Sequence, residues 1–402
     1  MAKVMTINSG SSSLKFKLYE MPEEKVLCSG NAERIGLPDG IFTIKYADKK
    51  DVTYPVIPNH EVAAKILLDS LVEKGIIKSF DEIEVTGHRI VQGGKYFSKS
   101  VLLDDDSYNK IESLIPLAPL HNPAHLTCYR AFKEVLPNTP AVAVFDTAYH
   151  QTMEPQDYMF AIPYDLSEKY DIRRYGAHGT SHNYLALEGA KYLEGIENPK
   201  IISCHIGSGA SITAIKNGKC VATSMGLTPL GGIMMGTRTG DMDPSVFNYV
   251  CTVTGKTPEE VYQMFNKESG FKGVSKISND SRDVLDAVEQ GVETAILAND
   301  LFNRRIADYI GQYYVRLGGA DLIIFSAGIG ENEPRTRAAV CDLISEALGV
   351  KINKEFNATL RGKEAIISTE DSSVKIAVIP TDEEVMIARD SYAISEELKA
   401  NA

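Results

Sequence analysis

The alternation of apolar and polar residues near the start of the chain predicts a β-hairpin. Residues 4–7 are mostly apolar, and residues 14–19 alternate apolar with polar positions, which is the period of a half-buried strand. Gly10 and several serines lie between the two runs. Such a turn suits an ordinary hairpin, because glycine and serine are common turn residues. It equally suits an anion site, in which Gly10 lets the backbone approach the anion while Ser11–Ser13 and Lys15 point at it.

Related patterns follow along the chain. Strands are expected at residues 83–92 and 141–146, with a helix at residues 107–118 between them. Residues 201–219 again predict a strand, a Gly/Ser turn and a strand, almost half a chain length after the first hairpin. Both turns contain a Gly-Ser pair and lead into an alternating apolar run. This faint repeat indicates a duplicated domain, with one hairpin from each half facing a phosphate, and a boundary near residue 150.

Two further segments near the C-terminus carry polar residues after apolar strands. Residues 321–340 predict a strand, a turn containing Gly328, and then a helix. Residues 374–394 predict a strand and a helix with Thr381 as its N-cap and Glu384 as its capping partner. Because ligands of open α/β sheets bind at the carboxyl ends of the strands, both segments are candidates for a ligand site.

Composition restricts the class of protein. A chain of 402 residues with 44% hydrophobic and 24% charged residues is typical of a globular protein with two domains. The net charge of −12 argues against nucleic-acid partners and anionic membranes, and any phosphate ligand then requires a local cluster of cations. We find no long apolar run and no signal peptide. Six widely spaced cysteines without a C-x-x-C pair favour a reducing cytoplasm over disulfides or zinc.

Charged residues at turns and strand ends are the best candidates for chemistry. Arg89 lies just before a double glycine, and Arg238 lies between two glycines, positions where a guanidinium suits carboxylate or phosphate binding better than solvation. Asp146 ends a predicted strand and Glu383 begins the last helix, although each also suits a simple cap or first-turn charge. Asp243 precedes a proline and is best explained as a helix N-cap.

Several familiar motifs are incomplete. The Gly255-Lys256-Thr257 sequence lacks the first glycine of a P-loop, and Thr257 with Glu260 is expected to form a helix capping box. The turn at Gly328 lacks the third glycine of a dinucleotide fingerprint. The histidines form two H-x-x-x-H pairs, "HNPAH" and "HGTSH", which we expect at turns or helix starts and not in a metal site.

Taken in order, these segments resemble the acetate kinase family. "TINSGSSSLK", "GHRIVQGG", "APLHNP", "FDTAYHQTM", "YGAHGTSH", "HIGSGAS", "MMGTRTGDMDP", "AGIGEN" and "TDEEVMIARD" correspond to the family's motifs across essentially the whole chain. The resemblance implies an α/β fold of two duplicated actin-like ATPase domains, related to ribonuclease H, with a nucleotide cleft between them. It implies an N-terminal domain of residues 1–149 completed by residues 383–402, a nucleotide-binding domain of residues 150–382, and a homodimer.

The resemblance also implies roles for individual residues. Arg89 is expected to hold the acetate carboxylate, and Asp146 to organise magnesium and water. His121 is expected beside the phosphoryl path, and His178 and Arg238 are expected to stabilise the transition state. The acetate methyl pocket is assigned to Val91, Leu120 and Pro229; the metal site, for Mg²⁺ or alternatively Mn²⁺, to Asn8 and Glu383; and ATP or ADP binding to Ser11, Ser13, Lys15, His205, Ile206, Gly207, Ser208, Gly209, Asp280, Ser281, Arg282, Gly328, Ile329, Gly330, Glu331 and Asn332.

The chemistry expected is direct in-line transfer of a phosphoryl group from ATP to acetate, giving acetyl phosphate and ADP. A carboxylate is already ionised at pH 7, so the site must neutralise charge and needs no general base. Three residues depart from the family pattern: Ala177 stands where phenylalanine is usual, Ser208 where asparagine is usual, and Gln92 where histidine is usual. Because Ala177 removes bulk near the expected methyl pocket, a propionate or other short-chain acyl kinase is an alternative.

Two other classes of protein remain open from the residues. One is a nucleotide-dependent switch that binds ATP without acetate-dependent turnover. The other is a dinucleotide-dependent oxidoreductase that uses the turn at Gly328, although this class leaves the two arginine turns unexplained.

Overall fold

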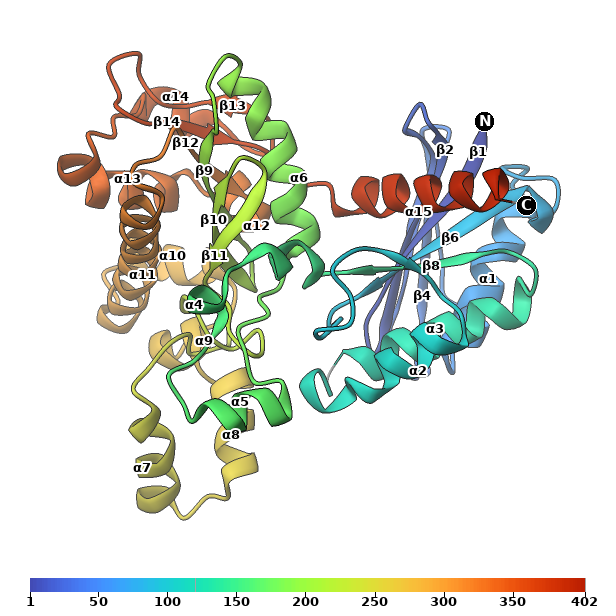
Figure 1. The fold of residues 1–402 in the computed structure, drawn as a ribbon, viewed down its shortest axis with the longest axis horizontal. Coiled ribbons are helices and arrows are strands. Elements are labelled where there is room, and N and C mark those ends of the chain that lie inside the picture. The colour runs from blue at the N-terminus through green and yellow to red at the C-terminus, as the bar shows by residue number, and fades with distance from the viewer. Residues whose placement is uncertain (120, 402) are drawn as a thin grey trace. The chain divides into compact units, whose positions relative to one another are not determined.

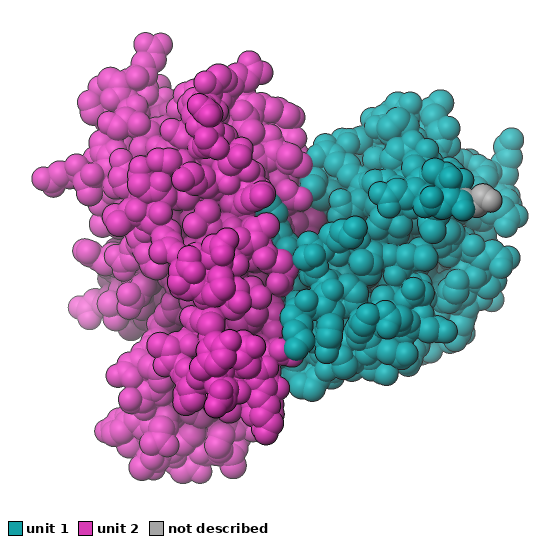
Figure 2. Space-filling model, in the orientation of Figure 1, with its two compact units in different colours: residues 1–149, 382–402 teal, residues 150–381 magenta. Residues whose placement is uncertain are grey.

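The computed structural model describes residues 1–119 and 121–401. The chain divides into two compact units, residues 1–149 with 382–402 and residues 150–381 (Figure 2). Each unit is built on one mixed sheet with helices against it (Figure 1). No helix within the described residues combines the length and the apolar composition needed to cross a bilayer.

The sheet of the first unit runs in the order β5-β4-β3-β2-β1-β6-β8-β7. β1 pairs antiparallel with β2 and parallel with β6, and β6 pairs parallel with β8. The hairpin predicted at the start of the chain is confirmed as β1 and β2. The strands are β1 (Ala2–Ser9), β2 (Ser13–Met21), β3 (Lys25–Glu33), β4 (Ile41–Tyr46), β5 (Lys49–Thr53), β6 (Ile83–Ile90), β7 (Val101–Leu102) and β8 (Ala141–Phe145).

Helices cover both faces of this sheet, and two neighbouring residues of β6 show why. An added Cβ on Gly87 would lie 2.2 Å from Ser391 Oγ, so glycine lets α15 approach the strand. His88 points to the opposite face and packs edge-on against Tyr129 and Phe132 of α3. The helices of this unit are α1 (His60–Glu73), α2 (Asp105–Ser113), α3 (Asn122–Val135) and α15 (Glu383–Ala400).

The second unit repeats the strand order of the first. Its sheet runs β11-β10-β9-β12-β14-β13, with β9 and β10 antiparallel and with β9, β12 and β14 mutually parallel. The five strands β11-β10-β9-β12-β14 therefore match β3-β2-β1-β6-β8 in order and direction, as the predicted duplication requires. The strands are β9 (Lys200–Ile206), β10 (Ala210–Lys216), β11 (Lys219–Thr223), β12 (Leu322–Ser326), β13 (Ala365–Ile366) and β14 (Lys375–Val378).

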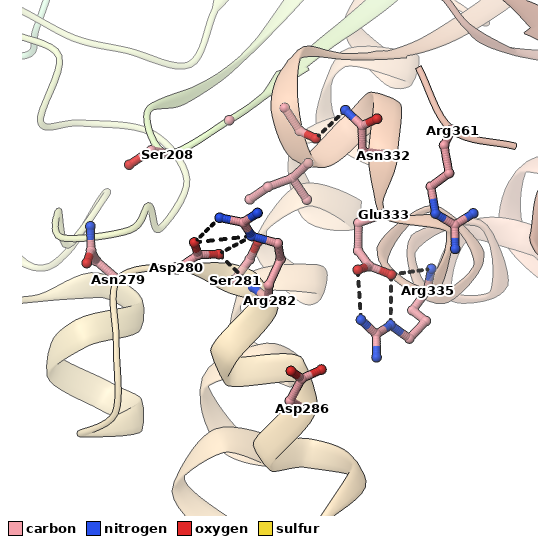
Figure 3. A pocket seen from close by; sticks show the side chains of 13 residues that line it. Ser208, Asn279, Asp280, Ser281, Arg282, Asp286, Asn332, Glu333, Arg335 and Arg361 are labelled. Carbon is pink, nitrogen blue, oxygen red and sulfur yellow. Dashed lines mark hydrogen bonds and ion pairs between the residues drawn. The ribbon is translucent and has the colours of Figure 1, made fainter. Parts of the chain in front are cut away.

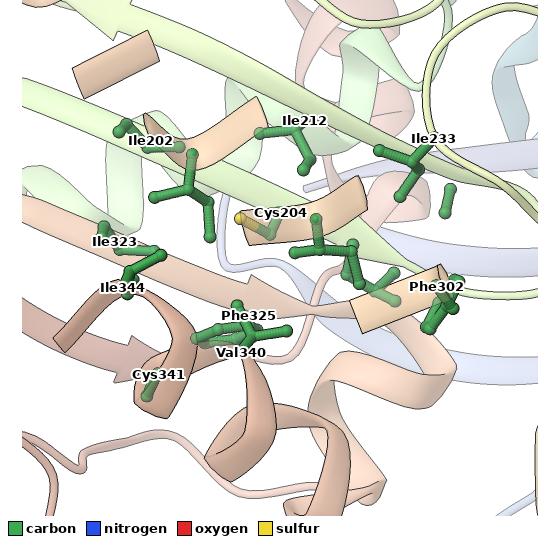
Figure 4. Close-up of a cluster of buried hydrophobic side chains, with 14 of the residues drawn as sticks. Ile202, Cys204, Ile212, Ile233, Phe302, Ile323, Phe325, Val340, Cys341 and Ile344 are labelled. Atoms are coloured by element: carbon green, nitrogen blue, oxygen red, sulfur yellow. The ribbon is translucent and has the colours of Figure 1, made fainter. Parts of the chain in front are cut away.

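One face of this second sheet forms a large apolar core (Figure 4). Ile202 and Cys204 of β9 and Phe325 of β12 pack there with Phe302 of α11 and Val340 of α13. α6 packs against the opposite face, where polar side chains alternate with the apolar ones. The longer helices are α6 (Gly179–Ala190), α7 (Pro244–Thr254), α8 (Pro258–Lys267), α10 (Ser281–Glu289), α11 (Glu293–Leu317) and α13 (Pro334–Leu348); the shorter ones are α4 (Pro155–Tyr158), α5 (Tyr164–Tyr170), α9 (Gly270–Ser275), α12 (Ala327–Asn332) and α14 (Lys354–Thr359).

The capping predictions have mixed outcomes. The capping box of Thr257 and Glu260 is confirmed, and Asp243 caps α7 through a bond from the Ser245 N–H. Thr381 was the wrong cap for the last helix. Asp382 takes that role because its carboxylate accepts from the backbone N–H of the third helical residue, while Thr381 uses its own N–H and hydroxyl elsewhere.

Two predicted element boundaries were also wrong. The helix expected at residues 107–118 ends at Ser113, because Pro116 lies in a separate 3₁₀ turn that follows it. Gly328 does not lie in a loop before a helix, since α12 begins directly after β12 and includes it.

Candidate active site

In the first unit, three predicted site residues lie at the carboxyl ends of adjacent parallel strands. Asn8 is near the end of β1, Arg89 near the end of β6, and Asp146 directly follows β8. Arg89 binds Asp146 with two bonds, Nε to Oδ1 at 2.9 Å and Nη2 to Oδ2 at 2.6 Å. Its Nη1 donates to Asn8 Oδ1 at 3.1 Å. The strand order that the sheet adopts therefore brings together residues far apart in sequence.

Burial raises the energetic cost of the charges in this group. Asp146 is only 1% exposed, whereas the Arg89 side chain keeps 20% of its surface in solvent. Burial raises the pKa of Glu383, at the start of α15, to about 7; Arg89 opposes this effect and Asp146 adds to it. Burial lowers the pKa of Arg89, but Asp146 and Glu383 outweigh it, so the net shift is upward. One guanidinium thus faces two carboxylates, and the set favours a further cation.

The oxygen atoms of this group fit a divalent cation such as Mg²⁺. Asn8 and Glu383 offer an amide oxygen and a carboxylate, which are hard ligands. Mg²⁺ is commonly held by one or two protein side chains, with substrate phosphates and water completing its shell. Within residues 1–119 and 121–401, no group of three or more His, Cys, Asp or Glu side chains is arranged to hold a metal ion.

The turn between β1 and β2 presents its polar side chains outward. The turn closes with a bond from the Gly10 N–H to the Ser13 carbonyl at 2.8 Å. Ser11 and Lys15 are exposed, and Ser13 is half-buried. Lys15 pairs across the hairpin with Asn8, so its ammonium belongs to the same end of the sheet as the Arg89 group. The exposed side chains of Ser11 and Lys15 are therefore accessible to an anion.

The loop after Arg89 is fixed by residues of α3. The Val91 N–H donates to His125 Nδ1 at 3.3 Å, and Asn122 exchanges two hydrogen bonds with the backbone of Gln92. Burial, aided by Arg89 and His121, lowers the pKa of His125 to about 3, so this histidine is a neutral acceptor. His121 itself is the residue before α3. The His121 and His125 pair was the sequence signal for this support, and Leu120 lies outside the described residues.

In the second unit, a corresponding hairpin turn lies beside two cationic or polar side chains. The Gly207 N–H bonds to the Gly209 carbonyl at 3.1 Å and closes the turn between β9 and β10, and Ser208 is exposed. A Cβ placed on Gly209 would lie 3.5 Å from Arg238 Nη1 and 3.7 Å from His178 Nε2. The turn therefore brings His178 and Arg238 to one place, as their predicted roles require.

Arg238 differs from Arg89 in its charge balance. Its Nη1 donates to the carbonyl of Pro229 at 3.2 Å, and no carboxylate among the described residues forms an ion pair with it. Burial lowers its pKa, and Tyr262 opposes this only in part. A partly buried guanidinium without a counter-charge is a strong site for an incoming anion.

A pocket of about 850 Å³ opens beside this turn (Figure 3). Three predicted nucleotide segments meet in it, contributed by the β9–β10 turn, the start of α10 and the short helix α12. The lining residues predicted from the sequence are Gly207, Ser208, Asp280, Ser281, Arg282, Gly328, Ile329 and Asn332, and those not predicted are Asn279, Asp286, Glu333, Arg335 and Arg361.

The charged residues around the pocket hold one another in place. Arg282 forks onto the carboxylate of Asp280, with Nη2 to Oδ2 at 2.5 Å, and Arg335 binds Glu333, with Nε to Oε1 at 2.8 Å (Figure 3). Glu333 and Arg335 follow the "AGIGEN" segment directly, so its extension by a few residues would have found them. Arg361 gave no sequence signal.

The remaining predicted nucleotide residues of this unit do not line the pocket. Ile206 and Gly330 are buried, and His205 is 8% exposed. Glu331 Oε1 accepts from the Thr381 N–H at 3.1 Å. Ala177 is 3% exposed and belongs to the apolar core of this unit.

Comparison with known proteins gives the family. The model described as the Acetokinase family matches residues 3–389. The acetate kinase of Macrococcus caseolyticus is 52% identical over 392 residues, covering 97% of this chain and 98% of the relative, and that of Bacillus subtilis is 51% identical, covering 98% and 100%. Two solved structures each give a TM-score of 0.92 and cover 98% of this chain and 100% of the other: Porphyromonas gingivalis acetate kinase at 43% identity and a Francisella tularensis propionate kinase at 40%. The chain therefore belongs to the acetokinase family.

Proposed function

We propose that this chain is a Mg²⁺-dependent acetate kinase that transfers the γ-phosphoryl group of ATP directly to acetate, giving acetyl phosphate and ADP in a reversible reaction. The observation that carries the proposal is similarity over nearly the whole chain to acetate kinases at about half identity. The family acts on ATP or ADP with a divalent metal, for which Mn²⁺ is an alternative. The arrangement of residues in each unit supports the roles that follow.

Arg89 is the proposed acetate ligand. A guanidinium has five N–H donors, and the two bonds to Asp146 and one to Asn8 leave two of them for a carboxylate. Asp146 then orients Arg89, in addition to its expected part in organising metal and water. Buried Val91, held by His125, is the nearby apolar contact for the methyl group.

The charge on the phosphoryl group is the main obstacle to the reaction, since an anion must approach another anion. Arg238 and His178, which flank Gly209, are proposed to stabilise the charge that develops on that group. Lys15, the serines of the first hairpin and His121 are proposed to contact it as well. When bound at Asn8 and Glu383, Mg²⁺ supplies the remaining positive charge.

The pocket of the second unit is the proposed nucleotide site. Its volume of about 850 Å³ lies within the range for small-molecule sites. Glycines of the β9–β10 turn and of α12 let backbone groups approach the phosphates. Asp280, which Arg282 binds, is proposed to accept from hydroxyl or amino groups of the nucleoside.

A propionate kinase remains the second candidate, because one similar structure has that name and Ala177 is small. Comparison of kcat/KM for acetate, propionate and butyrate separates the two, and a clear preference for propionate would overturn the choice of substrate. We also propose a homodimer and a cytoplasmic enzyme. Its six cysteines are all free thiols, a state that a reducing compartment maintains.

Trapping of the acyl phosphate with hydroxylamine tests the function and the residues together. Parent protein with ATP, acetate and Mg²⁺ is expected to form hydroxamate. Arg89→Ala is expected to lower kcat/KM for acetate by roughly 10- to 100-fold, the loss of a charged hydrogen-bonding group. Arg238→Ala is expected to lower kcat by ~100-fold or more. Asp146→Ala should lower both kcat/KM for acetate and kcat.

The control is Lys354→Ala, because Lys354 forms an exposed ion pair with Asp342 and does not line the pocket. It should behave as the parent. If the three site variants stay folded and keep the parent's activity, the residue assignment is wrong. If the parent forms no acyl phosphate from any short carboxylate, the proposed function fails.

A further inference from the structure

A chain of alternating hydroxyl and imidazole groups lies behind His178. His178 Nδ1 is 2.9 Å from Ser211 Oγ, and the same hydroxyl is 2.7 Å from His182 Nε2. His182 Nδ1 in turn is 2.6 Å from Ser203 Oγ. The two histidines are four residues apart at the start of α6, and the two serines lie on the paired strands β9 and β10.

The inner members of this chain are sealed from solvent. Ser203, Ser211 and His182 are all 0% exposed, and none of them lines the nucleotide pocket. Burial, together with neighbouring His150 and His205, lowers the pKa of His182 well below its usual value. His182 is therefore neutral and carries one N–H and one acceptor nitrogen.

The number of available protons restricts the direction of the hydrogen bonds among these four side chains. Ser211 has one hydroxyl proton, so it donates to one imidazole and accepts from the other. If His182 Nε2–H donates to Ser211, then Ser211 donates to His178 Nδ1, and Ser203 donates to His182 Nδ1. In this direction His178 Nδ1 is an acceptor, and the ring proton of His178 is on Nε2.

The opposite direction suits an anion site poorly. It makes His178 Nδ1 the donor, so that a neutral His178 turns the lone pair of Nε2 outward. Nε2 and Cε1 of His178 both lie 3.7 Å from the position of a Cβ built on Gly209, and Arg238 Nη1 lies 3.5 Å from the same position. A lone pair there would repel a phosphate oxygen, whereas an N–H would donate to it.

We propose that His182 and Ser211 are positioning residues that act through hydrogen bonds to hold His178 in the Nε2–H tautomer and to fix its ring beside Gly209 and Arg238. The inference rests on the proposed function for its effect on catalysis. The tautomer itself is a property of the resting protein and is measured without turnover.

Ser211→Ala removes the link, and Thr213→Val is its matched control. Thr213 lies two residues further along β10, is equally buried, and bonds to Thr223 in place of a histidine. Ser211→Ala loses two bonds of a buried hydroxyl and Thr213→Val loses one, so Ser211→Ala is expected to lose the more stability, and the thermal stability of both variants is measured beside kcat. Only Ser211→Ala is expected to lower kcat, by ~10-fold or more, with the KM for ATP and acetate nearly unchanged.

His182 is tested by a pair of substitutions. His182→Gln places an amide N–H near the position of Nε2 and is expected to keep activity within about tenfold of the parent. His182→Leu has no donor and is expected to match or exceed the loss of Ser211→Ala. If Leu and Gln variants of equal thermal stability have equal kcat, the proposed link through Ser211 is refuted.

NMR of the histidine side chains in ¹⁵N-labelled protein reads the tautomer directly. The ring of His178, assigned by its absence in His178→Gln, is expected to show the Nε2–H pattern in the parent and in Thr213→Val, and a mixture in Ser211→Ala. An Nδ1–H pattern in the parent, or no change in Ser211→Ala, overturns the inference. Failure of the proposed function would appear separately, as a parent with the Nε2–H pattern but no acyl phosphate.

Discussion

Arg337 offers the sharpest test of how the fold supports the nucleotide pocket. This arginine of α13 is 0% exposed and has five hydrogen bonds to neutral oxygens. It donates to the carbonyls of Gly330 and Glu331 at 2.9 and 3.0 Å, to the carbonyl and the side-chain oxygen of Asn357 at 3.2 and 2.8 Å, and to the carbonyl of Leu360 at 2.9 Å. The first two carbonyls belong to the last turn of α12, where no helical partner is available. Arg337 therefore ties α12 to the segment that carries Leu360.

The change Arg337→Met keeps an apolar stem of similar length and removes every donor. A hydrogen bond contributes about 0.5 to 1.5 kcal/mol to stability, and we take ~1 for each of the five bonds. Burial, with Arg361 nearby, lowers the pKa of Arg337 to about 10, which shows that its charge is held at a cost. Relief of that cost returns ~2 kcal/mol. The expected net loss is ~3 kcal/mol, a fall in Tm of roughly 6 to 12 °C for a unit of this size.

Thermal unfolding by calorimetry measures the loss, and Lys354→Ala serves as the control. Arg337→Lys should fall between parent and Arg337→Met, because an ammonium keeps the charge but cannot fork among five acceptors. Since α12 carries pocket residues, the KM for ATP should rise by ~10-fold in Arg337→Met, with the KM for acetate little changed. An Arg337→Met protein as stable as the parent would refute the reasoning, as would one that is less stable but binds ATP equally well.

The other predictions concern single positions. Gly87→Ala brings a Cβ to 2.2 Å from Ser391 Oγ and 2.6 Å from Ile387 Cγ2. We therefore expect urea unfolding to show a loss of at least ~2 kcal/mol in the free energy of unfolding. No loss would mean that α15 can move away from β6. Burial lowers the pKa of His88 from 6.5 to about 3 in the folded protein. Between these two pH values the unfolded chain binds a proton at His88 and the folded protein does not. The free energy of unfolding therefore falls as the pH drops from 6.5 towards 3. His88→Phe should flatten that fall by ~1.4 kcal/mol per pH unit below pH 6 in urea titrations, and an unchanged slope would contradict the assignment. Thr257→Ala removes an exposed N-cap and should cost ~1 kcal/mol without effect on turnover.

The sequence predicts best those features that depend on neighbouring residues. The two hairpins follow from alternation and glycine turns, and the cap at Thr257 follows from a pattern of four residues. The cap at Thr381 was wrong for a reason that lies outside the local pattern. Its N–H is hydrogen-bonded to Glu331 and its hydroxyl to Ser181, and both partners are far away in sequence.

Supporting residues escaped prediction because their partners meet only in the folded chain. His182 and Ser211 are 29 positions apart, and Arg337 and Leu360 are 23 apart. Arg361 reaches the pocket from a loop without any motif. Residues that contact a ligand directly tend to lie in short glycine-rich segments, which a sequence pattern can reveal. The residues that orient these contacts come together only through strand pairing and packing, which a local pattern does not show.

The charge balance at the two arginines suggests why an acidic protein can bind two anions of different kinds. Arg89 is neutralised by a bidentate carboxylate, so it attracts an anion weakly over distance, but it still has two N–H groups beyond those bonded to Asp146 and Asn8. That is a means of orienting a monoanion such as acetate. Arg238 has no carboxylate partner among the described residues, and its surroundings hold its charge at a cost. A phosphate that binds beside Arg238 offsets that cost. The effect is largest when the negative charge on the phosphoryl group increases during transfer. The first arginine therefore suits recognition of the substrate, and the second suits stabilisation of the phosphoryl group during transfer.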